Sequence, residues 1–198
     1  MNAGRKPPPR ARLQASKPGS VRIIGGRWRG TRLPVPDRPG LRPTSDRVRE
    51  TLFNWLQPQL PGARVLDLFA GSGALGLEAL SRGAASAQLV EADATLASGL
   101  RELGVRLGAG GQLKVHGGDA LAWLSARPPS VFDIAFVDPP FDADLWDGVL
   151  ALLPALMAAQ AWIYLESPSA FAPVLPVEWS LHRENHTRDV RYGLYRRG

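Results

Sequence analysis

From Arg64 to Leu165 the chain alternates short apolar runs with longer amphipathic segments, and this alternation constrains the fold more than any other feature. Runs of this length, bounded by glycine and polar residues, predict buried strands that are each followed by a helix. Strands are expected over residues 65–69, 87–90, 113–115, 132–137 and 162–165, and helices over residues 74–81, 94–107, from 119 and over 145–156. Repeated strand–helix units build a parallel sheet with helices on both faces.

The two ends of the chain follow other patterns. Residues 178–184 and 189–195 predict a hairpin, which adds one antiparallel strand and gives an α/β fold with a doubly wound, seven-stranded, mostly parallel sheet that is Rossmann-like. Near the start, residues 21–24 and 31–35 predict a small β-hairpin, and Thr44 or Ser45 can cap a helix over 46–56. The expected organisation is a disordered basic arm (1–20), a basic hairpin plus helix (21–60) and the sheet domain (61–198).

Composition excludes several classes of protein. The 198 residues contain no cysteine, which excludes disulfides, a thiol nucleophile and cysteine-bound metal. No apolar run approaches the roughly 20 residues of a membrane span, and no signal-peptide core is present, so we expect a cytoplasmic protein with no membrane partner. The three histidines lack ligand spacing, and no metal site is expected.

Charge is segregated along the sequence. Residues 1–50 carry 13 basic and 3 acidic residues, whereas the other 148 carry 11 basic and 15 acidic residues. A basic quarter on an acidic body indicates a polyanion held at one edge of the protein. A merely solubilising tail is the alternative, and for residues 1–20 it is the favoured interpretation.

A glycine-rich turn, Asp67-Leu-Phe-Ala-Gly-Ser-Gly-Ala-Leu-Gly76, follows the first strand of the predicted sheet. It contains G-x-G-x-x-G, and Glu91 follows 20 residues after Gly71, as in dinucleotide sites. Asp67, however, would repel a pyrophosphate and suit a cationic, phosphate-free cofactor such as S-adenosylmethionine. Glu91 would accept from ribose hydroxyls, and Asp119 would meet the adenine amino group. The candidate cofactor residues are Asp67, Phe69, Ala70, Gly71, Ser72, Gly73, Glu91, Asp119 and Ala120.

Asp138-Pro-Pro-Phe141 ends another predicted strand of the same sheet. The prolines lack N–H groups, so this rigid corner offers acceptors only. The Asp138 carboxylate and the Pro139 carbonyl can hold both N–H bonds of an amino group on a planar ring, and Phe141 can stack on that ring. A turn that merely ends the strand is the alternative. The predicted catalytic residues are Asp138, Pro139, Pro140 and Phe141.

These motifs resemble those of class I S-adenosylmethionine-dependent methyltransferases that act on amino nitrogens. Arg22–Gly30, Gly40–Trp55 and Asp67–Gly83 are more narrowly similar to the bacterial 16S ribosomal RNA guanine-N2 methyltransferases, and the similarity runs from about residue 21 to the C-terminus. The resemblance implies S-adenosylmethionine as cofactor, methylation of one guanine of 16S rRNA, guanine-966, and the small ribosomal subunit or an assembly intermediate as partner. We expect a monomer.

The resemblance also gives the basic N-terminal region a role in holding RNA. Arginine forks pair with phosphates, and an aromatic ring among them offers a stacking surface. The candidate RNA-binding residues are Arg22, Arg27, Trp28, Arg29, Arg42, Arg47 and Arg49. Arg47 and Arg49 could instead pair with Glu50 or Asp46 along their helix.

Three other functions stay open. A DNA adenine-N6 methyltransferase would share the Asp-Pro-Pro-aromatic sequence, although 198 residues leave little room for a base-reading domain. A protein glutamine methyltransferase would carry Asn-Pro-Pro-Tyr instead of Asp138 to Phe141. A non-enzymatic NAD- or RNA-binding module would leave Asp67 unexplained.

Overall fold

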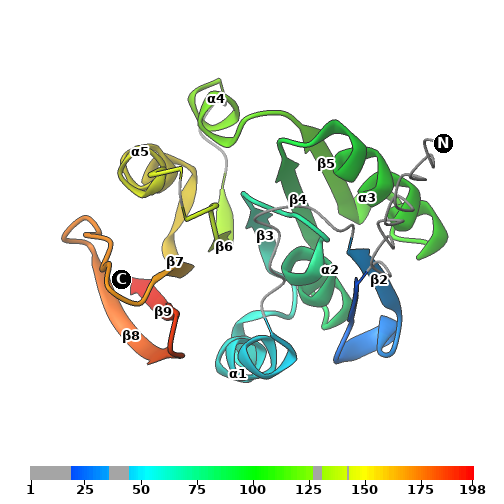
Figure 1. The fold of residues 1–198 in the computed structure, drawn as a ribbon, viewed down its shortest axis with the longest axis horizontal. Helices are drawn as coiled ribbons and strands as arrows, with labels where there is room; N and C mark the ends of the chain where they lie inside the picture. The colour runs from blue at the N-terminus through cyan, green and yellow to red at the C-terminus, as the bar shows by residue number, and fades with distance from the viewer. Residues whose placement is uncertain (1–18, 36–44, 127–130, 142) are drawn as a thin grey trace, which may run out of the picture.

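The structure is a computed structural model that describes residues 19–35, 45–126, 131–141 and 143–198. Within these ranges its main feature is a seven-stranded sheet in the order β5-β4-β3-β6-β7-β9-β8 (Figure 1). The strands are β3 (Arg64–Asp67), β4 (Ser86–Glu91), β5 (Leu113–Gly117), β6 (Phe132–Val137), β7 (Met157–Pro168), β8 (Trp179–His186) and β9 (Val190–Arg197). β3 to β7 pair in parallel, and β9 runs antiparallel to both of its neighbours. The predicted fold is confirmed.

Helices cover both faces of the sheet. One face carries α1 (Asp46–Leu56), α2 (Ala74–Ser81) and α3 (Ala94–Arg106), and the other carries α4 (Ala120–Ser125) and α5 (Trp146–Leu152) (Figure 1). Side chains alternate along the buried strands, so Val65, Ile134 and Phe136 pack toward α1 and α2, whereas Leu66 and Ala135 pack toward α4 and α5.

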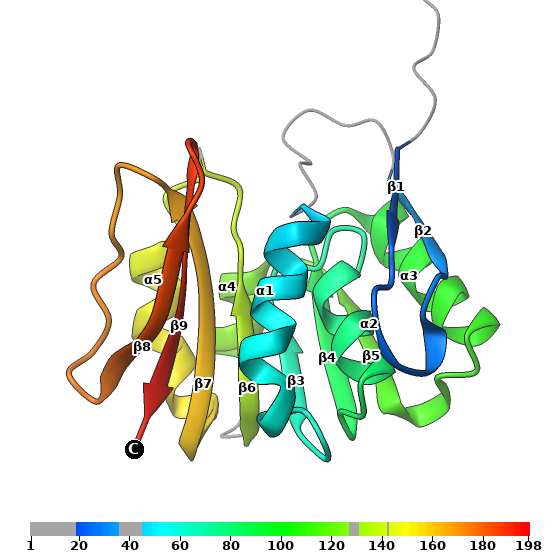
Figure 2. The same cartoon turned by 90° about the horizontal axis from the view of Figure 1, so that it is seen from below.

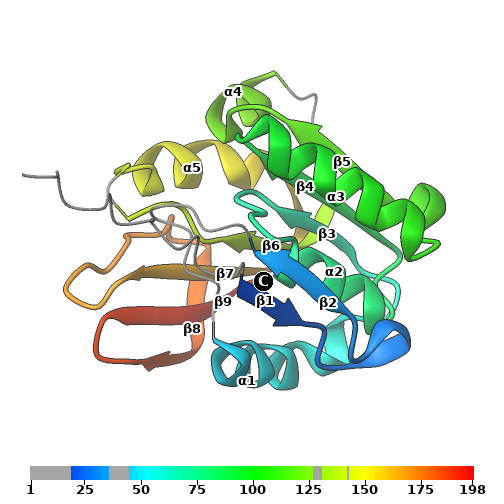
Figure 3. The same ribbon diagram turned by 45° about the vertical axis from the view of Figure 1, so that its right-hand side comes forward.

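The N-terminal hairpin consists of β1 (Gly19–Arg22) and β2 (Arg32–Val35), joined through the 3-10 turn η1 (Gly26–Trp28). Figures 2 and 3 show it beside α2. Its inward side chains belong to the same apolar core as α1 and α2; they are Val21, Ile23, Leu33 and Val35. Gly19 and Ser20 are part of β1, so the predicted arm overlaps this strand at its end, and residues 1–18 of that arm lie outside the described residues.

Several strand and helix boundaries differ from the sequence prediction, and two of these differences have a clear physical cause. The helix after β6 ends at Leu152, and the chain continues as the 3-10 turn η4 (Leu153–Leu156). Pro154 explains this end, because proline cannot donate a backbone bond and disfavours the α conformation of the preceding residue. β7 begins at Met157, five residues earlier than expected, because Met157 pairs with Phe132 of β6 and Ala161 pairs with Arg197 of β9. Two further 3-10 turns are η2 (Gln57–Gln59) and η3 (Gly110–Gln112).

Candidate active site

Four acidic residues stand at the carboxyl ends of four neighbouring strands. Asp67 ends β3, Glu91 ends β4, Asp119 follows β5 and Asp138 follows β6. The strands are parallel and adjacent, so these ends lie on one edge of the sheet. Ligands of open α/β sheets bind at this edge, where the strand order changes direction. Here the change falls between β3 and β6.

Asp67 is 3% exposed, and its carboxylate faces the start of α2. Its Oδ2 accepts a hydrogen bond from the Gly76 backbone N–H at 2.9 Å. Burial raises the pKa of Asp67 to about 7, although the Gly76 and Phe69 N–H groups oppose that rise and the Glu91 charge adds to it. The carboxyl group therefore anchors α2 near its N-terminus, and any cation that binds beside it stabilises its ionised form.

The glycine turn between β3 and α2 is held by Glu91. Glu91 Oε2 accepts from the Gly71 N–H at 2.7 Å, and Oε1 accepts from the Asp93 N–H at 2.8 Å. Gly71 and Gly73 have φ of 53° and 76°, the left-handed region that favours glycine. A Cβ on Gly73 would also come within 2.5 Å of the Leu100 side chain. The turn thus needs both glycines and is tied to the end of β4.

Asp119 is exposed and caps α4, because its Oδ1 accepts from the Ala122 N–H at 2.8 Å. The adjoining Gly118 N–H donates to the Glu91 carbonyl at 2.9 Å, which joins the ends of β4 and β5. Ala120 is buried beside it, whereas Phe69 and Ser72 are half-buried. All the predicted cofactor residues therefore belong to this edge, although their contact with a cofactor stays a prediction.

The Asp138–Phe141 corner continues directly from β6. Asp138 is half-buried, Pro139 is buried, and the ring of Phe141 is 40% exposed. The Phe141 ring lies 6.0 Å from that of Trp146, between ring centroids, and Trp146 lies 5.1 Å from Phe171. An exposed ring supported from below by other rings is suited to stacking on a planar base.

Sequence reasoning missed two buried polar residues behind this corner. The Tyr164 hydroxyl donates to Glu166 Oε1 at 2.8 Å, and both residues are buried. Burial raises the pKa of Tyr164 well above its ordinary value, and the charges of Glu166 and Asp138 add to the rise. Glu166 lies in the longer β7, so the expected strand over 162–165 stopped one residue too early to include it.

The predicted RNA-binding residues differ in their exposure to solvent and in their contacts. Arg22, Arg29 and Arg47 are exposed. Arg27 is exposed too; its guanidinium lies 4.1 Å from the centroid of the half-buried Trp28 ring, and its Nη2 donates to Gln112 at 2.7 Å. Arg42 lies outside the described residues.

The structure corrects the prediction for Arg49. Its side chain is fully buried, and its Nη2 donates to the Arg22 carbonyl at 2.8 Å and to Asp46 at 2.7 Å. The ion pair with Asp46 is the alternative that the helical spacing allowed. Arg49 therefore fastens α1 to the hairpin and offers no guanidinium to RNA, because Val48, Arg49 and Leu52 form the buried stripe of α1.

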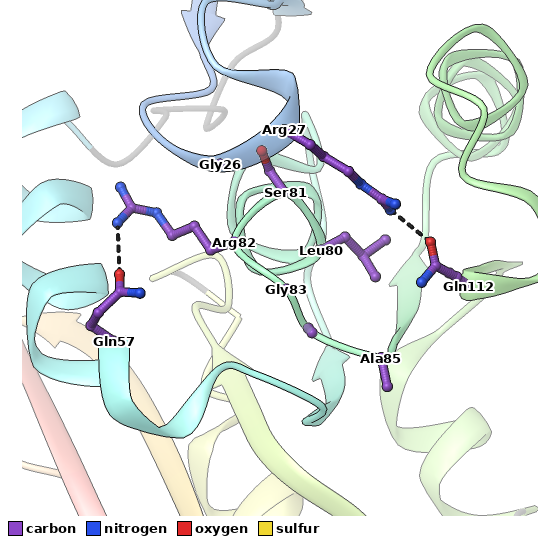
Figure 4. A pocket seen from close by; sticks show the side chains of 10 residues that line it. Gly26, Arg27, Gln57, Leu80, Ser81, Arg82, Gly83, Ala85 and Gln112 are labelled. Carbon is purple, nitrogen blue, oxygen red and sulfur yellow. Dashed lines mark hydrogen bonds between the residues drawn. The ribbon is translucent and has the colours of Figure 1, made fainter.

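A hollow of about 520 Å³ lies at the amino ends of the strands, away from the glycine turn. It is bounded by the hairpin turn, the end of α2 and Gln112 (Figure 4). Arg27 donates to Gln112 across one side, and Arg82 donates to Gln57 across the other. The four acidic strand ends do not line it.

The residues of the glycine turn fit a cationic cofactor better than a dinucleotide. A pyrophosphate needs free N–H donors at the helix start. Here the Gly76 N–H is bound to Asp67 and the Gly71 N–H to Glu91, and every charged member of the predicted cofactor set is acidic. A sulfonium and an ammonium are favoured by such a set. The sheet order, the single antiparallel strand and this turn define a class I S-adenosylmethionine-dependent methyltransferase.

Comparison with known proteins identifies the family. Residues 21–196 match the family described as conserved hypothetical protein 95, and the chain belongs to it. It is 50% identical over 182 residues to ribosomal RNA small subunit methyltransferase D of Escherichia coli (strain K12), covering 90% of this chain and 91% of that protein. The protein of the same name from Haemophilus influenzae is 42% identical, with 89% and 94% covered. The solved structure of the putative methyltransferase yhhF from Escherichia coli has a TM-score of 0.83 and 49% identity, with 90% and 98% covered.

The chain is therefore a methyltransferase that uses S-adenosylmethionine as methyl donor. Among the described residues no helix has the length and apolarity that a membrane crossing requires.

Proposed function

We propose that this protein methylates the N2 amino group of one guanine in the 16S rRNA of the small ribosomal subunit, and that by resemblance the target is guanine-966. The names of the relatives support the substrate class, ribosomal RNA of the small subunit. A substrate of this kind places the enzyme in the cytoplasm, where it acts as a monomer on the RNA or on an assembly intermediate.

The observation that carries the proposal is the position of the Asp138–Phe141 corner. It leaves β6 beside β3, whose end carries the glycine turn, so an amino group at Asp138 lies next to the methyl donor site. When bound there, S-adenosylmethionine supplies a methyl group on a positively charged sulfur, which accepts the electron pair of the broken C–S bond.

The residues of the corner prepare the nucleophile. The lone pair of a guanine amino group is delocalised into the ring, which makes the nitrogen a weak nucleophile. Hydrogen bonds from this amino group to the Asp138 carboxylate and the Pro139 carbonyl favour a pyramidal nitrogen and stabilise the positive charge that develops on it. Phe141 stacks on the extruded base, and the rigid prolines fix the line of attack. The surplus amino proton leaves through Asp138 to solvent.

The basic N-terminal region holds the RNA backbone in this proposal. Arg47 is exposed near the N-terminus of α1, and its charge lowers the pKa of Tyr192, which burial and Glu166 raise. Tyr192 lies opposite Glu166 in the pairing of β7 with β9, so the charge of Arg47 acts near the edge of the sheet that carries the site. Residues 21–60 serve as the RNA-contacting extension, with Arg22, Arg27, Trp28, Arg29 and Arg47 on its surface, and residues 61–198 serve as the methyltransferase domain.

Methyl transfer from radiolabelled S-adenosylmethionine tests the proposal. The full chain is offered 16S rRNA fragments and small subunits that lack this methyl group, in parallel with duplex DNA and a glutamine-containing protein substrate. We expect label only in RNA, as N2-methylguanine on digestion. Label in DNA adenine would support the adenine-N6 alternative, and label in protein the glutamine alternative; either result would overturn the proposal.

A further inference from the structure

Glu166 lies in β7 beside Asp138, the residue that follows the end of β6. β6 and β7 pair in parallel with Val137 opposite Leu165, so the next residue of each strand is Asp138 and Glu166. Two residues earlier, the Phe136 and Tyr164 rings lie edge to face at 6.3 Å on one side of the sheet. Alternation places Glu166 on that same side, and both carboxylates act on the Tyr164 hydroxyl.

Glu166 is buried and fixed in place. The residue is 5% exposed; its Oε1 accepts from Tyr164, and its backbone carbonyl accepts from Trp146 Nε1 at 3.0 Å. Trp146 is the ring that supports Phe141. Burying a carboxylate costs free energy unless such donors hold it. The proposed methyl transfer at Asp138 does not itself require Glu166. Glu166 therefore lies one strand from Asp138, and its backbone is tied to the ring that supports Phe141.

Guanine differs from the other bases in the edge that it offers there. Its N1–H lies directly beside the N2 amino group, so the edge presents adjacent donors. Adenine and cytosine place an unprotonated ring nitrogen beside their amino group, and that nitrogen is an acceptor. A pair of acceptors on the protein therefore matches guanine and opposes adenine, because two acceptors face each other without a proton between them.

We propose that Glu166 is a specificity-determining residue that accepts a hydrogen bond from N1–H of the target guanine while Asp138 accepts from its N2 amino group. This inference rests on the proposed function, since it assigns the second contact of the same base. The Asp-Pro-Pro-aromatic sequence is common to several amino methyltransferases. In this protein Glu166, on the neighbouring strand β7, would make the second contact with the base and so restrict the site to guanine.

The test replaces the target guanine of the RNA by 2-aminopurine, which keeps the 2-amino group but has an unprotonated N1. Single-turnover methylation of both RNAs is measured with saturating S-adenosylmethionine. We expect the wild-type protein to prefer guanine by roughly 100-fold, because the unprotonated N1 of 2-aminopurine would face a carboxylate oxygen with no proton between the two acceptors. In Glu166→Gln the amide can donate to N1, so we expect the preference to fall at least 10-fold.

The control is Glu184→Gln, an exposed β8 residue paired with Arg191, which should keep the wild-type preference. If Glu166→Gln lowered the methylation rates of both RNAs equally, Glu166 would have a structural role and the inference would be overturned. Equal methylation rates for the guanine and 2-aminopurine RNAs in the wild-type protein would also overturn the inference. This comparison needs no variant, so it decides the question even if Glu166→Gln fails to fold. A wild-type protein that leaves the guanine RNA unmethylated would instead defeat the proposed function itself.

Discussion

At the scale of single residues, Asp67 is a buried carboxyl group whose ionisation is opposed by its surroundings. Burial raises its pKa from 3.8 to about 7, so between these values the folded protein holds a proton that the unfolded chain releases. The stability that this proton contributes is fully present below pH 3.8 and is lost as the pH rises through about 7, in total at most about 4 kcal/mol. The folded protein should therefore become less stable from pH 5 to pH 8.

Urea denaturation at pH 5 and pH 8 measures this dependence. Asp67→Asn keeps an oxygen that can accept from Gly76 but cannot ionise, so its free energy of unfolding should change less between the two pH values than that of the wild type. If the free energy of unfolding changed equally in the two proteins between pH 5 and pH 8, Asp67 would be ionised throughout. The hydrogen bond from the Gly76 N–H would then lower the pKa of Asp67 more than burial raises it.

Asp138 is the residue on which methyl transfer itself should depend. Because its proposed partner is the target amino group, Asp138→Ala should lower kcat by about 100-fold or more while changing the Kd for S-adenosylmethionine by less than about threefold. Asp138→Asn should keep partial activity, since its amide oxygen accepts one hydrogen bond. Calorimetry and single-turnover rates separate the two quantities, and a lost cofactor affinity together with poor folding would identify Asp138 as a structural turn residue.

At the scale of elements, one glutamate of α2 fastens the N-terminal hairpin. Glu78 is fully buried and accepts from the Ile24 and Gly25 N–H groups at 2.7 and 2.8 Å. It also pairs with Arg82 at 2.7 Å and faces the buried Arg49 at 3.8 Å. Removing one partner of a buried ion pair leaves the other charge without compensation.

Glu78→Ala should therefore lower the free energy of unfolding by about 3–5 kcal/mol, measured by urea denaturation. Glu102→Ala, at an exposed position of α3, is the matched control and should change it by less than about 0.5 kcal/mol. A loss of less than about 1 kcal/mol in Glu78→Ala would contradict the anchoring role of this carboxylate.

Most elements could be predicted because local patterns and tertiary packing agree. Ser45 caps α1, with its Oγ accepting from the Val48 N–H at 3.3 Å, and the predicted bounds of α1, α2 and β6 match the structure. The start of β7 could not be predicted, since its alanines have little strand preference and its first residue, Met157, is placed by pairing with Phe132 of β6. The four acidic strand ends followed from topology, whereas Glu166 required the true length of β7.

At the scale of the whole molecule, the uneven charge gives a prediction about salt. If Arg27, Arg29 and Arg47 each neutralise one phosphate, changing all three to glutamine should reduce the slope of log affinity against log salt concentration by about 2–3. Affinity for a small-subunit RNA fragment is measured by filter binding across a salt series, and cofactor affinity should not change.

A control for loss of charge is available on β8 and β9. Arg183 and Arg196 are exposed on these strands, away from the turn that joins them at the carboxyl edge of the sheet, and their double glutamine variant should keep nearly the wild-type slope. A reduction in slope that is proportional to the charge removed in both variants would mean that the RNA responds to net charge alone and not to the hairpin surface.

A charge pattern in the sequence does not determine which individual arginines are exposed to solvent. The segregation of charge was readable from the sequence, yet it does not tell an exposed guanidinium from a buried one. Arg47 and Arg49 are two residues apart on α1, and only the packing of the hairpin against that helix separates their roles. A helix face that receives another element cannot be identified from the helix alone.

The attachment of the hairpin to α2 determines how readily the proposed RNA-contacting hairpin could be moved between methyltransferases. The first turn of α2 begins at the glycine loop, and its last turns carry the two side chains, Glu78 and Ser81, that hold the hairpin backbone. The glycine loop and the attachment of the hairpin thus share the eight residues of one helix. A chimaera that moves residues 19–35 onto another methyltransferase must transplant these two acceptors as well, so the hairpin and the helix are inherited as a single unit.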